Sequence, residues 1–135
     1  MSHDLTDLFG PVIHTYTRAQ AIEDGALREV PADLAREAGF RYPLALTAAA
    51  WSDAVAWNEA NAGLQDETGR LWDVLTMARH TLARTPPWED RALFDVLRVP
   101  NTPRAHSPRR TTLRVHFGPG DNAEPVLTIL MPNED

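Results

Sequence analysis

The hydrophobic positions of the middle of the chain recur at helical spacing. The clearest apolar stripe lies between Asp66 and Pro86, where apolar residues return every three or four positions. It consists of Leu71, Val74, Leu75, Ala78 and Leu82. Residues 47–63 show similar spacing, with Thr47 as the N-cap and Gly63 at the end. A turn of about four residues would join the two segments, so we predict an antiparallel helix pair.

The last third of the chain has a β pattern. Residues 111–117 alternate, with Leu113, Val115 and Phe117 on one face and polar side chains on the other. Residues 126–131 are almost continuously apolar, which predicts a central strand, and residues 93–99 form a third candidate strand. The glycine- and proline-rich segment 118–125 predicts a hairpin loop.

The first third of the chain predicts short alternating elements. We expect short strands at 11–16, 26–30 and 42–46. Thr17 and Gln20 form a capping box at the start of a short helix that ends at Gly25. A second helix starts at a proline and ends at Gly39, where Phe40 is placed for a Schellman-type contact.

These elements predict one α+β domain spanning residues 1–135. We expect an antiparallel β-sheet, built from the C-terminal meander and the short N-terminal strands. The antiparallel helix pair and the shorter helices would pack on one face of that sheet. Residues 1–10 read as a loose lead-in, and residues 100–110 as a long basic loop that is exposed or disordered.

Composition excludes several classes of site. The chain has 135 residues and no cysteine, which rules out disulfides, iron–sulfur clusters and thiol catalysis. The five histidines show no helical pairing, and no phosphate-loop, dinucleotide or nucleophile-elbow motif is present, so we predict no metal and no cofactor. No apolar run approaches the roughly 18 residues of a membrane helix, and no secretory signal opens the chain. We therefore expect a cytoplasmic protein without a membrane partner.

Charge is distributed unevenly along the chain. All 13 basic residues are arginines, and the net charge of −6 argues against broad nucleic-acid binding. Residues 1–73 carry 12 acids and 5 arginines, whereas residues 74–135 carry 7 acids and 8 arginines. The halves either neutralise each other in the fold or present an acidic and a basic surface.

The first candidate site is the segment from Tyr16 to Asp24. Glu23 and Asp24 end a helix, where the dipole disfavours acids, and Arg18 stands at its start, where it would suit a bound anion. Such departures from local rules often mark function. The alternatives are ion pairs within the fold or plain solvation.

A second candidate is Arg70 with Trp72, since both residue types are favoured at binding hot spots. Trp72 lies off the apolar stripe; an exposed ring would indicate an interface, whereas a buried ring would be core.

The third candidate is a basic patch. It comprises Arg98, Arg104, Arg109, Arg110, Arg114 and His116. Arg114 and His116 share one face of a predicted strand, and we expect Arg98 across from them. An arginine-bearing face beside a basic loop could grip phosphates, although the face has no aromatic side chain for base stacking. The alternative is a solvated outer face.

Four segments resemble a known family. They are YTRAQAIEDG (16–25), AREAGFRYPLALT (35–47), QDETGRLWDVL (65–75) and GPGDNAEPVLTILMPNED (118–135). Together they are similar to a small bacterial family of unknown function carried largely on plasmids, integrative elements and phages. The resemblance implies an accessory protein of mobile DNA, and it carries no established catalytic residue.

Three functions follow from these observations. The first is a non-enzymatic protein-binding or inhibitory module, acting on a host or element-encoded protein. The second is a small enzyme or a nucleotide- or phosphate-binding protein that uses residues 16–24. The third is nucleic-acid binding through the arginine-rich loop. The sequence leaves the presence of any catalytic activity open.

Overall fold

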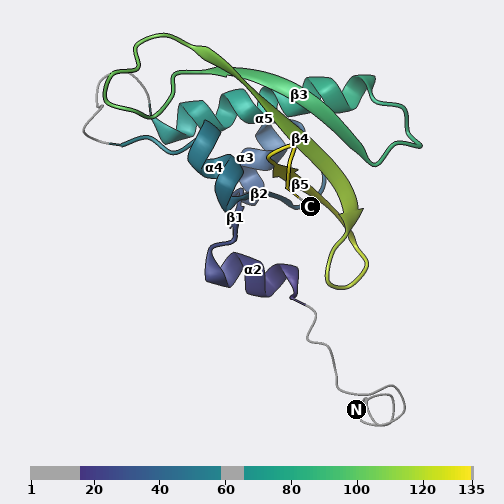
Figure 1. Cartoon of the computed structure of the whole chain (residues 1–135). Helices are drawn as coiled ribbons and strands as arrows, with labels where there is room; N and C mark the ends of the chain where they lie inside the picture. Colours follow the sequence, from purple (N-terminus) through teal and green to yellow (C-terminus); the bar gives the residue numbers. More distant parts are fainter. Residues whose placement is uncertain (1–15, 59–65, 135) are drawn as a thin grey trace.

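The computed structural model describes residues 16–58 and 66–134. Its elements are α2 (Arg18–Asp24), β1 (Leu27–Glu29), α3 (Ala32–Glu37), β2 (Leu44–Thr47), α4 (Ala48–Ala54), α5 (Glu67–Arg84), β3 (Arg91–Arg98), β4 (Arg109–Pro119) and β5 (Pro125–Leu130) (Figure 1). The predicted α+β class is confirmed. The lead-in 1–10, most of the strand predicted at 11–16 and the end of the helix predicted at Gly63 fall outside the described residues.

The five strands form one sheet in the order β1-β2-β5-β4-β3. The C-terminal meander is confirmed, because β3 pairs with β4 and β4 with β5, both antiparallel. The prediction of a wholly antiparallel sheet is wrong, since β2 pairs with β5 in parallel, with Leu44 opposite Leu127. A parallel pair requires a long crossover, and here α4, α5 and two strands lie between β2 and β5. Local alternation carries no information about that orientation.

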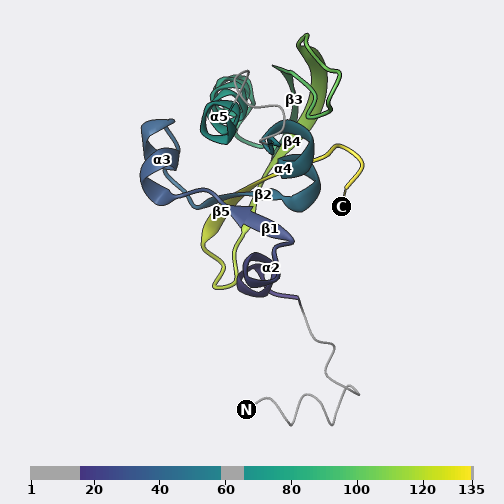
Figure 2. The same cartoon turned by 90° about the vertical axis from the view of Figure 1, so that its left-hand side faces the viewer.

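The helices lie on both faces of the sheet, not on one as predicted. Leu113, Val115 and Ile129 point to the inner face and join α4 and α5 in the core. Thr128, one position before Ile129, points to the outer face, where Arg18 of α2 donates to its Oγ1 at 2.8 Å. Figure 2 shows α2 on the opposite side of the sheet from α3, α4 and α5. Periodicity predicts that a helix has an apolar side but not which face of a sheet it covers.

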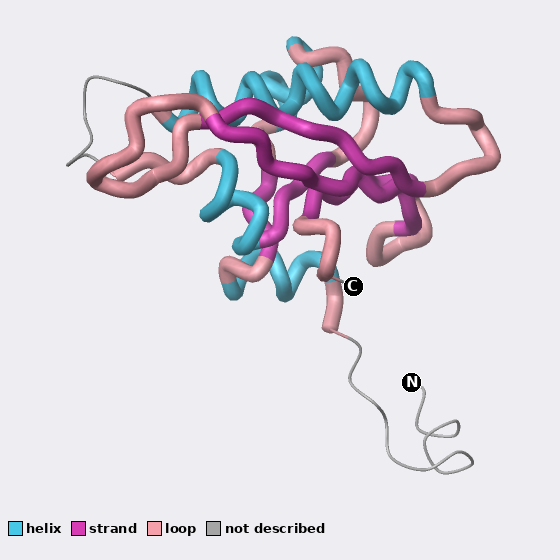
Figure 3. The backbone as a smooth tube through the Cα atoms, turned by 45° about the horizontal axis from the view of Figure 1, so that its top comes forward, coloured by secondary structure: helices cyan, strands magenta, loops and turns pink. Residues whose placement is uncertain are grey.

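The long helix α5 matches its prediction, and the helix pair does not. Leu71, Val74, Leu75 and Ala78 of the predicted stripe are buried, Leu82 is partly buried, and Asp66 is the N-cap. The helix packs against β3, and Figure 3 shows it running alongside the strands. The helix α4 is only seven residues long and ends at Ala54, so no extended antiparallel pair forms. At the end of α4 the Val55 carbonyl accepts a 2.9 Å hydrogen bond from Arg70 Nε, which satisfies a carbonyl that has no partner within the helix.

The end signals in the first third are confirmed. Thr17 and Gln20 form the capping box of α2, and Gly25 closes that helix with φ +84°. Gly39 has φ +96° after α3, and the Phe40 N–H donates to the Ala35 carbonyl at 2.9 Å. Phe40 is thereby turned into the core.

Candidate functional site

Arg18, the cation expected to suit a bound anion, is engaged by other parts of the protein. Asp121, from the β4–β5 hairpin, accepts hydrogen bonds from the backbone N–H groups of Arg18 (2.7 Å) and Ala19 (3.0 Å). The Arg18 guanidinium donates to Thr128 Oγ1 and, at 2.9 Å, to the Leu127 carbonyl. The start of α2 therefore already holds an anion, and that anion is a carboxylate of the chain itself.

The titration of these groups reflects the same contacts. The two backbone N–H donors, of Ala19 and Arg18, lower the pKa of Asp121, because they stabilise its charged form. Burial lowers the pKa of Arg18. The Tyr16 hydroxyl donates to Asp24 Oδ2 at 2.9 Å, and this bond to a carboxylate raises the pKa of Tyr16. Glu23 is exposed beside Asp24.

Arg70 and Trp72 lie on α5, across the sheet from α2. Arg70 is only 2% exposed; its Nε donates to the Val55 carbonyl and its Nη1 to the Val99 carbonyl at 2.7 Å. Its guanidinium also lies 4.9 Å from the Trp57 ring, and burial lowers its pKa. Trp72 is 38% exposed. The six candidates from Tyr16 to Trp72 therefore do not converge on one site.

The basic patch is divided between two faces. Arg98 was expected opposite Arg114 and His116, but it lies on the inner face, where it forms a 3.0 Å ion pair with Asp53. Asp53 also accepts from Thr111 Oγ1 at 2.6 Å, so α4 is anchored to β3 and β4. The alternation of side chains along β3 explains this position. Arg98 follows the outward-facing Leu97 and therefore points to the same side as Val96.

On the outer face, Arg114 is used to hold the C-terminal segment. Its Nη1 donates to the Pro132 carbonyl at 3.3 Å and its Nη2 to the Glu134 carbonyl at 2.6 Å. His116 shares that face, as the alternation predicted. The members of the patch that point into solvent are Arg104, Arg109 and Arg110.

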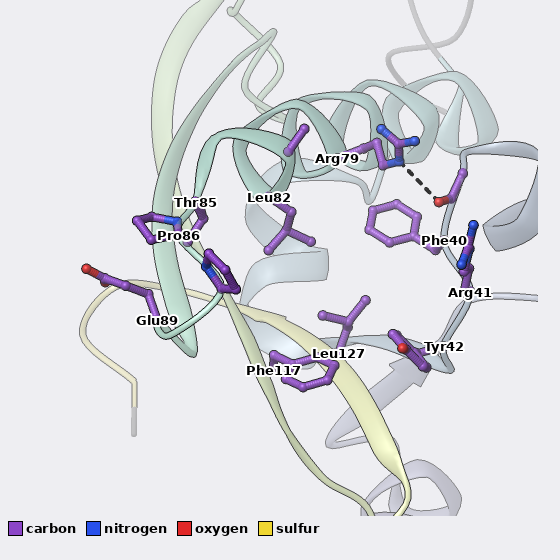
Figure 4. Close-up of a pocket in the computed structure, with 13 residues that line it drawn as sticks. Phe40, Arg41, Tyr42, Arg79, Leu82, Thr85, Pro86, Glu89, Phe117 and Leu127 are labelled. Atoms are coloured by element: carbon purple, nitrogen blue, oxygen red, sulfur yellow. Dashed lines mark hydrogen bonds between the residues drawn. The ribbon is translucent and has the colours of Figure 1, made fainter.

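A different place on the molecule has the form of a binding site. An open groove of about 440 Å³ lies between the C-terminal end of α5 and residues 39–42 (Figure 4). Its apolar walls come from four separate stretches of the chain. They include Phe40, Tyr42, Leu82, Pro87, Phe117 and Leu127. Small-molecule and peptide sites are typically concave, largely apolar and of this size.

Specific contacts fix the shape of this groove. The rings of Tyr42 and Phe117 meet edge to face, with centroids 5.5 Å apart, and form one wall. Arg79 Nε donates to the Gly39 carbonyl at 3.1 Å and joins α5 to the turn after α3. Gly39 is required at this point, because a Cβ there would lie 2.7 Å from Arg79 Nε and φ is +96°.

The rim of the groove is charged, and an exposed tryptophan is adjacent to it in the sequence. Arg41 and Arg79 lie at one end of the groove, and Glu89 lies at the other (Figure 4). Trp88, between the groove residues Pro87 and Glu89, is 82% exposed. Tryptophan is among the residue types enriched at binding hot spots.

Sequence reasoning missed this groove. Trp88 could have been found, since a tryptophan between two prolines and two acids cannot join a helical or strand stripe. Tyr42 and Phe117 could not have been identified from the sequence. They are 75 positions apart, and only the β2–β5 crossover brings them together. Within residues 16–58 and 66–134, no group of three histidine or acidic side chains is placed to hold a metal ion.

Comparison with known proteins places the chain in a family. No curated protein and no solved structure matches it. None of the helices in the described ranges is both long enough and apolar enough to cross a membrane. One family model matches residues 7–135, nearly the whole length. The chain therefore belongs to DUF6573, a family of unknown function.

Proposed function

We propose that the protein is a non-enzymatic binding module whose groove receives an extended apolar segment of a partner protein. The observation that carries this proposal is the apolar groove of about 440 Å³, with the exposed Trp88 between two of its lining residues in the sequence. Binding hot spots combine a pocket that excludes water with an aromatic anchor.

The groove also indicates the chemistry of the segment. An aliphatic or aromatic side chain of the partner would enter between Phe40, Leu82 and Phe117. A carboxylate on one side of it would approach Arg41 and Arg79, and a basic group on the other side would approach Glu89. Charge at a rim contributes mainly to association rate and orientation, while the apolar centre supplies most of the affinity.

The biological setting is a further part of the proposal. The resemblance to proteins of plasmids, integrative elements and phages supports a role as an accessory protein of mobile DNA, acting in the cytoplasm. A host protein or an element-encoded protein would supply the segment, and an inhibitory effect would follow if that segment is needed elsewhere.

The experiment is selection of a displayed random peptide library on the immobilised protein, followed by calorimetry with the selected peptides. We expect an apolar residue next to an acidic one. A83W fills the groove from an exposed position of α5 and should abolish binding. H80W places the same side chain at an exposed position of the same helix outside the groove and should leave binding unchanged. Peptides bound equally by both variants would contradict the proposal.

A second function is favoured by one observation, the exposure of both Arg104 and Arg109 in the 100–110 region. Phosphate contacts of a nucleic acid would suit these groups. That reading predicts an affinity for RNA or DNA that falls steeply with salt, and R104A/R109A should reduce the salt slope. The enzyme or phosphate-ligand alternative at residues 16–24 has less support, because Asp121 and Thr128 already engage Arg18.

A further inference from the structure

The strand β3 is an edge of the sheet and has no neighbouring strand on one side among the described residues. It is eight residues long, which is longer than protected edge strands usually are. A groove of about 410 Å³ lies between α5 and this strand, lined by Met77, Val96 and Leu97 among others.

The hydrogen-bonding phase of β3 identifies which backbone groups face outward. The Phe117 N–H donates to the Asp90 carbonyl at 2.7 Å, which makes these two residues a hydrogen-bonded pair. In an antiparallel ladder such pairs recur every second residue, so the even-numbered residues of β3 bond to β4. The N–H and C=O groups of Arg91, Leu93, Asp95 and Leu97 therefore point to the open edge.

The same four residues direct their side chains to the outer face, where they are exposed. Leu93 is 60% exposed and Leu97 is 66% exposed, whereas the even-numbered Phe94 and Val96 are buried. An edge that displays apolar side chains beside unpaired backbone groups is a template for another strand.

We propose that β3 joins β3 of a second copy of this chain in an antiparallel two-fold pair centred on Leu93. The charges select this occupant and this register. Arg91 and Asp95 stand at equal distances on either side of Leu93, and both point to the outer face. A two-fold axis at Leu93 places each Arg91 opposite the Asp95 of the other copy, so that both ion pairs form at once.

Neighbouring registers lose this complementarity. An axis at Asp95 would set the two Asp95 carboxylates against each other, and an axis at Leu97 would leave both Arg91 side chains beyond the paired segment. An edge carrying only one sign of charge would repel a second copy. The outer face of β3 carries one charge of each sign, which is the pattern that favours self-pairing. The present contacts of these groups, Arg91 with Asp90 at 3.0 Å and Asp95 with Arg110 at 3.8 Å, are on the exposed surface and would be exchanged for the pairs between copies.

The absence of cysteine from the chain makes cross-linking a direct test. Residues facing each other in a hydrogen-bonded antiparallel pair have Cα atoms about 5.5 Å apart, within the range of a disulfide. L93C should therefore form a covalent dimer under mild oxidation of the folded protein. L97C is the matched control, at a more exposed leucine on the same face of the same strand. In the proposed register the two Leu97 residues lie about 27 Å apart, at about 3.4 Å per residue, so L97C should stay monomeric.

Charge reversal tests the register without a covalent bond. Sedimentation equilibrium of the cysteine-free protein should show a monomer–dimer equilibrium. R91D alone and D95R alone should each weaken dimerisation about tenfold or more, and R91D/D95R should restore it to within about threefold. Circular dichroism of each variant verifies the fold.

The outcomes are decisive in both directions. L93C and L97C cross-linking at equal rates would show random collision and overturn the proposal. A wild-type chain that stays monomeric into the hundreds of micromolar would overturn it as well, and so would a double reversal that fails to restore the dimer. None of these results depends on the groove between α5 and residues 39–42. A83W alters that groove, which lies on the other side of α5 from the groove beside β3.

Discussion

The outer face of the sheet is covered at one end and exposed at the other. At the β2–β5 end, α2 approaches that face through Arg18, and the outward-pointing Val126 and Leu130 of β5 are buried. At the β3 end the corresponding residues are Leu93 and Leu97, and both are exposed. The outer face of the sheet is therefore covered at one end. At the other end it is exposed and apolar, and it is bordered by the unpaired edge of β3.

This difference separates residues that hold the fold from residues that are available to a partner. Arg18 at the covered end was an attractive candidate because charged groups often mark function, yet its backbone N–H bonds Asp121 and its guanidinium bonds the Leu127 carbonyl. Arg70, on the inner side, likewise bonds two carbonyls. The groove, Trp88 and the β3 edge are the apolar and accessible features. The proposed binding surfaces are therefore apolar, whereas the charged candidates Arg18 and Arg70 have partners within the fold.

The largest expected effect contrasts a leucine of each end. L46A removes a fully buried side chain of β2 and should lower the free energy of unfolding by about 3 kcal/mol. L97A removes an exposed side chain of β3 and should change it by less than about 0.5 kcal/mol. Urea denaturation of dilute protein measures both. Equal losses would show that the outer face of β3 is covered in solution and would remove the contrast.

The second effect tests whether Arg70 stabilises the fold or is available to bind a partner. R70A leaves the carbonyls of Val55 and Val99 without their donor in a buried site, so the free energy of unfolding should fall by about 2–3 kcal/mol. R84A removes an exposed arginine from the last turn of the same helix and should cost below about 0.5 kcal/mol. Thermal or urea unfolding separates the two. If R70A left stability unchanged, Arg70 would return as a binding candidate.

A third, smaller effect concerns the wall of the groove, and two glycines provide the comparison. Both Gly39 and Gly25 have positive φ, so alanine at either should cost about 1 kcal/mol. At Gly25 a Cβ would meet nothing within 4 Å, whereas at Gly39 it would lie 2.7 Å from Arg79 Nε. G39A should therefore cost more than G25A, and R79A in the same chain should recover part of that excess. An excess that persists in R79A/G39A would place the strain elsewhere than the groove wall.

The sequence predicted those features that depend on neighbours along the chain. The α5 stripe, the capping box at Thr17 and Gln20, and the turns at Gly25 and Gly39 are fixed by propensities and local hydrogen bonds. Such features are largely independent of the remainder of the fold.

The features that it did not predict depend on distant contacts. The short α4 ends where Arg70 bonds Val55, 15 positions away. The parallel β2–β5 pair joins segments that periodicity cannot relate, and it also brings Tyr42 to Phe117. The face that α2 covers is set by Thr128 and Asp121, more than a hundred positions along the chain. The candidate site at residues 16–24 could not be judged from the sequence for the same reason. The charge of a residue at a helix end does not reveal its partner, which only the tertiary structure brings near.

The last and smallest effect tests the covered end through pH. The pKa of Asp121 is lower in the folded chain than in the unfolded chain, where it is near 3.9. A lowered pKa contributes stability that is present above the unfolded value and is lost as the pH falls through the folded value. D121N should therefore be less stable than wild type at neutral pH, with the difference shrinking below about pH 4. E23Q, at an exposed acid of α2, the helix whose start Asp121 contacts, is the control and should follow the wild-type profile. A D121N profile parallel to wild type throughout would mean that the hairpin does not hold α2 in solution, and the outer face would then be open at both ends.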